Sequence, residues 1–169
     1  VAEQAFEILV DRYESLRTIV LNHLGEPKLR FGPRPKFRAT QAAATESLHA
    51  EARQTVARLV DTTWQIDVGP LIRGELLLAN ENQAVLIVAV HHLVCDGWSA
   101  RVLLTEFINA YAALASGRQP QLPPLTINAH AAARLLAAEG YDAEAVRRVA
   151  RRLDGMKRLV LPACGAQAA

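Results

Sequence analysis

The sequence has few cysteines and no apolar run long enough to cross a membrane. Only two cysteines occur among its 169 residues, Cys95 and Cys164, and they lie far apart without the paired spacing of a zinc site. We therefore expect no bound metal and a reduced, cytoplasmic setting. No apolar stretch approaches the length of about 20 residues that a membrane-spanning helix needs, so we expect no membrane partner.

An excess of either charge is also missing. The chain carries 19 basic and 17 acidic residues, and this near balance does not suggest a nucleic-acid partner. Arginines 147, 148, 151 and 152 are more simply the solvated face of a helix. The content of 51% hydrophobic and 21% charged residues is typical of one globular domain with a core. Because Val1 is not an initiator methionine and no signal-peptide pattern follows, we expect a piece of a longer protein.

Hydrophobic periodicity predicts an α/β domain with a mixed sheet packed against helices. The expected helices cover residues 1–16, 45–60, 99–116, 127–139 and 142–154. The expected strands cover residues 17–21, 36–40, 71–79 and 84–90, the last two forming a hairpin around residues 80–82. Prolines and glycines predict a loop at 24–35. In helix 45–60, the side chains expected to be buried are Leu48, Val56, Leu59 and Val60.

The most informative stretch follows the apolar run 84–90, which we interpret as a buried strand. His91 and His92 end this strand, and neighbouring side chains on a strand point to opposite faces. One histidine should therefore be structural and the other functional, which argues against a shared metal ion. Asp96 could accept a hydrogen bond from a histidine or pair with a distant arginine. Gly97 permits a tight or positive-φ turn before the next helix.

Two interpretations of this stretch are open from the residues alone. Both histidines could be hydrogen-bonded core groups beside an ordinary turn, or one could act as a general base near neutral pH. The whole string His-His-x-x-x-Asp-Gly, with Trp98 and Ser99 after it, resembles the signature of nonribosomal peptide synthetase condensation domains. Cys95, inside this string, is expected to be a small buried hydrophobe and not a nucleophile.

Other blocks resemble the same family. Residues 12–18, Arg-Tyr-Glu-Ser-Leu-Arg-Thr, are similar to the family motif Arg-His-Glu-x-Leu-Arg-Thr, with Tyr13 in place of histidine. By resemblance, Arg17 would form a buried salt bridge with Asp96, and loss of one partner of such a pair costs about 3–5 kcal/mol. Residues 64–73 resemble the block Phe-Asp-Leu-x-x-Gly-Pro-Leu-x-Arg, with Ile66 in the Phe position, and 153–162 resemble the end of the first half. Residues 128–133 depart from the family pattern Tyr-x-Asp-Tyr-x-x-Trp.

The resemblance implies a chloramphenicol acetyltransferase-like fold, in which two similar halves enclose an active-site tunnel. This chain (1–169) would be most of the N-terminal half-domain, without the opening strand and helix and without the C-terminal subdomain. A lone half has no closed tunnel to position two substrates, so we expect it to be inactive by itself.

The resemblance also implies a reaction. Family members form an amide between an acyl or peptidyl thioester and an aminoacyl thioester, both held on the phosphopantetheine of carrier proteins. His92 would be a general base or a positioning group, His91 and Asp96 would be structural, and the Gly97 N–H would face the developing oxyanion. No cofactor would bind directly. The partners would be carrier proteins, the missing C-terminal subdomain and neighbouring synthetase domains.

Two other functions are open. A related acyltransferase that forms esters would carry the same histidine signature, and a degenerate docking or scaffold module would keep the fold without turnover. His23, His49 and His130 belong to no motif, and we expect them to be surface or packing residues.

Overall fold

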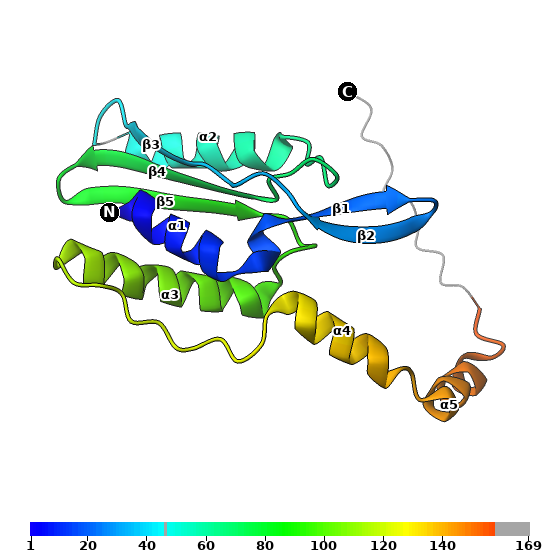
Figure 1. Cartoon of the computed structure of the whole chain (residues 1–169). Coiled ribbons are helices and arrows are strands. Elements are labelled where there is room, and N and C mark those ends of the chain that lie inside the picture. Colours follow the sequence, from blue (N-terminus) through cyan, green and yellow to red (C-terminus); the bar gives the residue numbers. More distant parts are fainter. Residues whose placement is uncertain (46, 158–169) are drawn as a thin grey trace, which may run out of the picture. The chain divides into compact units, whose positions relative to one another are not determined.

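The computed structural model describes residues 1–45 and 47–157, and the chain divides into two compact units, Val1–Ala132 and Ala133–Ala169. Figure 1 shows the elements in sequence order. The helices are α1 (Ala2–Arg12), the 3-10 turn η1 (Glu14–Arg17), α2 (Leu48–Asp61), α3 (Gly97–Ala115), α4 (Ala129–Glu139) and α5 (Ala143–Leu153). The strands are β1 (Thr18–His23), β2 (Glu26–Phe31), β3 (Phe37–Gln41), β4 (Ile72–Asn80) and β5 (Gln83–Val90).

The first unit is built on the sheet β3-β4-β5, which is mixed as predicted. Strand β3 runs parallel to β4, and β4 pairs antiparallel with β5 in the expected hairpin. Because side chains alternate along a strand, each face of the sheet presents its own apolar set. Val85, Ile87 and Ala89 pack with the α2 cluster, whereas Leu86 and Val90 pack with the cluster of α1 and α3.

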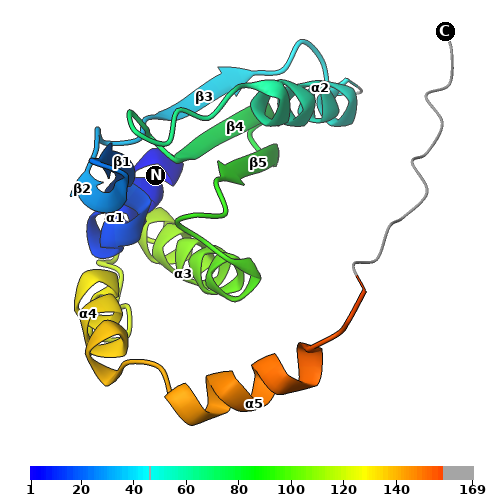
Figure 2. The same cartoon turned by 90° about the vertical axis from the view of Figure 1, so that its right-hand side faces the viewer.

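The sheet is therefore the middle of three layers, with α2 on one face and α1 and α3 on the other (Figures 1 and 2). Helix α1 contributes Phe6, whose ring packs on Phe37 of β3 with centroids 5.3 Å apart. Both rings lie against the backbone of Gly74 in β4, where an added Cβ would come within 2.8 Å of Phe37. Glycine at this position thus permits close packing of helix against strand.

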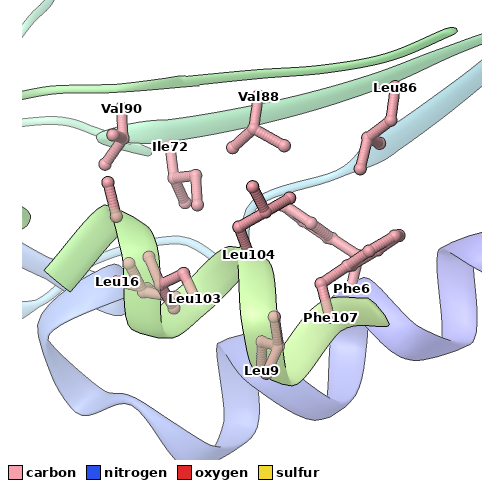
Figure 3. Close-up of a pocket in the computed structure, with 11 residues that line it drawn as sticks. Phe6, Leu9, Leu16, Ile72, Leu86, Val88, Val90, Leu103, Leu104 and Phe107 are labelled. Atoms are coloured by element: carbon pink, nitrogen blue, oxygen red, sulfur yellow. The ribbon is translucent and has the colours of Figure 1, made fainter. Parts of the chain in front are cut away.

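An apolar cavity of about 270 Å³ remains between β5 and α3. Figure 3 shows Leu86, Val88 and Val90 directed from the sheet toward Leu103 and Leu104 of the helix. The prediction of a buried strand at 84–90 is thus only partly right, because Ile87 is its one fully buried side chain and Val88 is 45% exposed. Among the described strands β5 lies at an edge of the sheet, which explains its incomplete burial.

Three predicted elements differ from the structure. The predicted loop at 24–35 contains strand β2, which pairs antiparallel with β1 through a turn where Leu24 and Gly25 take positive φ. All side chains of β2 are exposed, and although Leu29 and Phe31 alternate with Lys28 and Arg30, the prolines and glycines around them favoured a loop. The first helix ends at Arg12 and not at residue 16. In α2, Leu48 and Leu59 are buried as expected, but Val56 and Val60 are 45% and 68% exposed.

The second unit contains most of α4 and all of α5, which begins at the N-cap Asp142. The arginines of α5 are exposed, as expected, and Arg148 lies 3.5 Å from Glu144 one turn away. In the described parts of the chain no helix has the length and apolarity that a bilayer crossing requires. Cys164 and the end of the predicted block at 153–162 lie outside the described residues.

Helices α1 and α3 are joined by an ion pair that the sequence patterns did not predict. The Arg12 Nε donates to Glu106 Oε2 at 2.9 Å, and its side chain also donates to the carbonyl of Pro123. Both side chains of the pair are mostly buried, with 16% and 10% exposure. Glu106 follows Leu103 by three residues and precedes Ala110 by four, so its place on the buried face was readable from helical periodicity. The pair therefore fixes α3, and with it the turn that precedes α3, against α1.

We predict that Glu106→Gln lowers the free energy of unfolding by about 2–3 kcal/mol, because it leaves the partly buried Arg12 charge without its counter-ion. Urea unfolding followed by circular dichroism measures the change. The matched control is Glu7→Gln on the exposed side of α1, for which we expect less than about 0.5 kcal/mol. Equal effects of the two substitutions would contradict a structural role for the ion pair.

Candidate active site

The two histidines lie directly after β5, at the end of the sheet where β4 begins. The His91 N–H donates to the Leu71 carbonyl at 2.9 Å, which extends the β4–β5 ladder by one residue beyond Val90. A turn at residues 92–94 follows, and α3 starts at Gly97. The strand end, the turn and the helix N-terminus thus bring the predicted site residues 91–97 into one short segment, as the sequence indicated.

His91 is held by the fold. Its Nδ1 accepts the Leu93 N–H at 3.2 Å, so the ring proton of the neutral imidazole is on Nε2. The ring also meets the edge of Trp64, with centroids 5.9 Å apart. Trp64 in turn lies under the guanidinium of Arg73, 4.0 Å from the ring centroid. These contacts fit the structural role predicted for His91, and the sequence patterns did not reveal the part that Trp64 plays.

His92 differs from His91 in every contact. Its side chain is exposed, and within the described residues it has no side-chain hydrogen-bond partner. Its charge is close enough to Asp96 to contribute to lowering the pKa of that carboxyl. An imidazole at the end of a strand, with both nitrogens available, is free to exchange a proton with a group from outside this chain.

Asp96 is the N-cap of α3. Its Oδ1 accepts the Ser99 N–H at 2.7 Å, which satisfies one of the N–H groups that have no partner at a helix start. Hydrogen bonds from the side chain and then the backbone of Ser99 lower the pKa of the Asp96 carboxyl. The carboxylate therefore stays ionised at neutral pH and keeps the turn in shape.

The predicted salt bridge between Arg17 and Asp96 is not formed in the described structure. The Arg17 Nε donates to the Val10 carbonyl at 3.1 Å, and its guanidinium lies over the Phe31 ring, 5.5 Å from the centroid. Asp96 is exposed and bonded to its own helix. The physical reason is local: the N–H groups of α3 offer Asp96 a nearer partner, and Arg17 is satisfied by a carbonyl and an aromatic face.

Gly97 and Cys95 flank Asp96. Gly97 has no positive φ, contrary to one of the two turn geometries expected, and apart from its chain neighbours and its own helix backbone no heavy atom lies within 4 Å of the place where a Cβ would be. Nothing in the fold of this chain therefore requires glycine there. Cys95 is 6% exposed, and burial followed by the charge of Asp96 raises the pKa of its thiol. This confirms that Cys95 is a buried small residue, and the raised pKa disfavours a thiolate.

A second cavity, of about 310 Å³, opens beside the histidine turn. Its lining includes Val94 and Trp98 from the turn and the helix start, and Tyr13 from the other motif. Trp98 is 75% exposed, so its indole borders this cavity without being packed in the core. The two sequence motifs, about 80 residues apart, therefore meet at one surface.

His130 is a packing residue, one of the two roles expected for it. Its ring stacks on Phe31 with centroids 5.2 Å apart, and its Nε2 lies 3.3 Å from the Thr18 hydroxyl. His23 and His49 are exposed, as expected of surface residues. Across the residues that the structure places, no group of three or more histidine, cysteine, aspartate or glutamate side chains has the arrangement of a metal site.

Comparison with solved structures identifies the fold. The epimerization domain from the third module of tyrocidine synthetase B matches 95% of this chain with a TM-score of 0.76 and 24% identity. The starter condensation domain of rhizomide synthetase matches 93% with a TM-score of 0.79 and 18% identity. This chain covers 38% and 39% of those two proteins. The fold is therefore the α/β fold of these domains, which is chloramphenicol acetyltransferase-like.

Comparison of sequences gives the family. The model of the condensation domain matches residues 1–145, so the chain belongs to the condensation-domain family. The dimodular nonribosomal peptide synthase of Bacillus subtilis is 33% identical over 119 residues, which are 70% of this chain and 5% of that protein. Tyrocidine synthase 3 of Brevibacillus parabrevis is 38% identical over 109 residues, or 64% of this chain and 2% of the synthase. The chain thus spans a small part of its curated relatives.

Since Arg17 and Asp96 have separate partners, we predict that their substitutions act independently. The shifts in Tm caused by Arg17→Ala and Asp96→Ala should add in the double variant, as they do for sites without shared contacts. Thermal unfolding followed by circular dichroism measures the four forms. The parallel set Arg12→Ala, Glu106→Ala and their double variant is the control, and there we expect strong non-additivity. If Arg17 and Asp96 showed non-additivity as large as that of Arg12 and Glu106, the two residues would interact directly and the predicted salt bridge would be correct.

Proposed function

We propose that this chain supplies the histidine-bearing wall of a site that forms amide bonds in nonribosomal peptide synthesis. The observation that carries the proposal is the contrast between the two histidines: His91 is fixed by the fold, and His92 is exposed beside a helix N-terminus. Membership of the condensation-domain family and the similarity to peptide synthetases support it.

In the proposed reaction, the amine of a carrier-bound aminoacyl thioester attacks the carbonyl of a carrier-bound acyl or peptidyl thioester. The new C–N bond replaces the C–S bond, and the proton lost by the amine ends on the departing thiolate. His92 either accepts that proton as general base and returns it to sulfur, or orients the amine by a hydrogen bond. His91 Nδ1 is already an acceptor of the Leu93 N–H, which makes His91 the poorer base.

We propose that backbone N–H groups at the start of α3 stabilise the oxyanion that forms during the reaction. Asp96 satisfies the Ser99 N–H, which leaves the preceding N–H groups of Gly97 and Trp98 at the positive end of the helix. These donors can stabilise the charge that develops on the thioester carbonyl oxygen. The open space at the missing Cβ of Gly97 would let the substrate approach the backbone.

We propose that the parent protein supplies the rest of the tunnel. The chain corresponds to 38–39% of the two solved domains described above, in keeping with an N-terminal half that needs its C-terminal subdomain. The proposed partners are acyl and peptidyl carrier proteins with their phosphopantetheine arms, and neighbouring synthetase domains. No cofactor is proposed for the chain itself, and a cytoplasmic setting agrees with the free thiol of Cys95. The isolated chain is expected to be inactive because it cannot align two substrates.

We predict that His92→Ala lowers amide formation in the intact parent about 100-fold, because general acid–base groups commonly contribute that much. Mass spectrometry follows the transfer from an acyl-loaded to an aminoacyl-loaded carrier protein. His23→Ala, an exposed histidine at the end of β1, is the matched control and should retain full activity. The isolated chain should give no product.

Four outcomes would contradict parts of this proposal. Amide formation by the parent that ignores His92→Ala would remove the assignment of His92. A parent that acylates an alcohol in place of the amine would be an ester-forming enzyme, and one without turnover would be a docking module. Product from the isolated chain that disappears in His92→Ala would show that the half-domain builds a working site alone.

We also predict that Gly97→Ala separates folding from catalysis. Because a Cβ at this position would meet no atom beyond its chain neighbours and its own helix backbone, and φ is not positive, Tm should stay unchanged or rise slightly. Amide formation by the parent should fall about tenfold or more, since the methyl group would occupy space proposed for the substrate. Thermal unfolding and the carrier assay measure the two effects. A variant with normal turnover would show that substrate does not approach Gly97.

A further inference from the structure

A groove of about 530 Å³ lies where β3 and β4 begin and α2 ends, and its lining is strongly basic. Five cationic side chains border it and only one carboxylate does, that of Glu75. The cations are Arg34, Lys36, Arg38, Arg58 and Arg73. The whole chain has a net charge of only +2, so the positive charge is concentrated here.

Part of this charge is used within the fold. Arg58 lies 2.5 Å from the buried carboxylate of Glu75, and Arg34 is paired with Asp11. Arg73 is held flat over Trp64, which orients its guanidinium without neutralising it. Lys36 and Arg38 make no salt bridge among the described residues. The groove therefore has surplus positive charge on Lys36 and Arg38 at the start of β3 and on Arg73 in β4.

A purely structural explanation covers only some of these residues. Exposed lysine and arginine on an edge strand hinder pairing with another chain, and Lys36 and Arg38 can serve β3 in that way. That role does not account for Arg73 from β4, which lines the same hollow and has no salt-bridge partner among the described residues. Convergence of cations from separate elements around a concave surface is the arrangement expected of an anion site.

The chemistry of the lining favours phosphate over carboxylate. Four of the five cations are arginines, whose planar guanidinium groups bind phosphate oxygens through paired hydrogen bonds. The groove is also a hollow of small-molecule size, whereas the acidic surface of a protein would need a broad basic face. We infer that this groove binds a phosphate ester or a polyphosphate. The inference goes beyond the proposed amide chemistry, which assigns no role to these side chains.

The test is isothermal titration calorimetry at about 0.15 M salt, where the Debye length is about 8 Å, with pyrophosphate and free 4′-phosphopantetheine as separate ligands. Lys36→Gln/Arg38→Gln removes two groove cations that have no salt-bridge partner in the described chain. We expect it to weaken phosphate binding about tenfold or more. Lys28→Gln/Arg30→Gln removes the same two charges from exposed, alternate positions of β2, outside the groove lining. We expect this control to stay within about twofold of the unchanged chain, because salt screens distant charges.

The relative affinities of the two ligands identify the source of the phosphate, and other results would overturn the inference. Tighter binding of phosphopantetheine would assign the groove to the arm of a carrier substrate, and tighter binding of pyrophosphate to a free polyphosphate. The inference is overturned if neither binds, if the β2 control loses as much affinity, or if only a glutamate-rich peptide binds. Loss of pyrophosphate binding with intact His92-dependent amide formation would leave the proposed function unaffected.

Discussion

The antiparallel pairing of β4 with β5 is the constraint on which the rest of this domain depends. It fixes which side chains of β5 face α2 and which face α3, because successive residues alternate between the two faces. A slip of one residue would exchange the two apolar sets. The same ladder continues to His91, whose N–H bonds to Leu71. The register that builds the core therefore also determines where the histidine turn leaves the sheet.

From that point, two local interactions shape the candidate site. Asp96 caps α3, and the Arg12–Glu106 pair holds α3 against α1. The helix start is thereby fixed at its end and along its side, which is what a site with backbone donors requires. The site uses contacts within this segment for its shape, and its exposed atoms, on His92 and around Gly97, are those without a role in packing.

The sequence was sufficient for the class of fold and for the segment that carries the site. The continuous apolar run located β5, the turn at residues 80–82 located its hairpin partner β4, and helical periodicity located α3. Strand β2 was missed although Leu29 and Phe31 alternate with Lys28 and Arg30, because the prolines and glycines of this segment favoured a loop. The long-range contacts were also beyond pattern reading: Trp64 on His91 and Arg17 on Phe31 depend on how separate elements pack. The resemblance to the family predicted a salt bridge between Arg17 and Asp96, but in the structure Asp96 caps α3 and does not pair with Arg17.

The basic groove and the histidine turn lie at the same end of the sheet, and this proximity has a physical consequence. Arg73 connects them: it borders the groove, covers Trp64, and Trp64 contacts His91. The indole covers one face of the guanidinium, and the N–H groups at its edge stay available to an anion. An anion that binds them would restrict Arg73 and the Trp64 ring stacked on it. Occupancy of the groove would therefore stabilise the layer against which His91 packs, although neither histidine lines the groove.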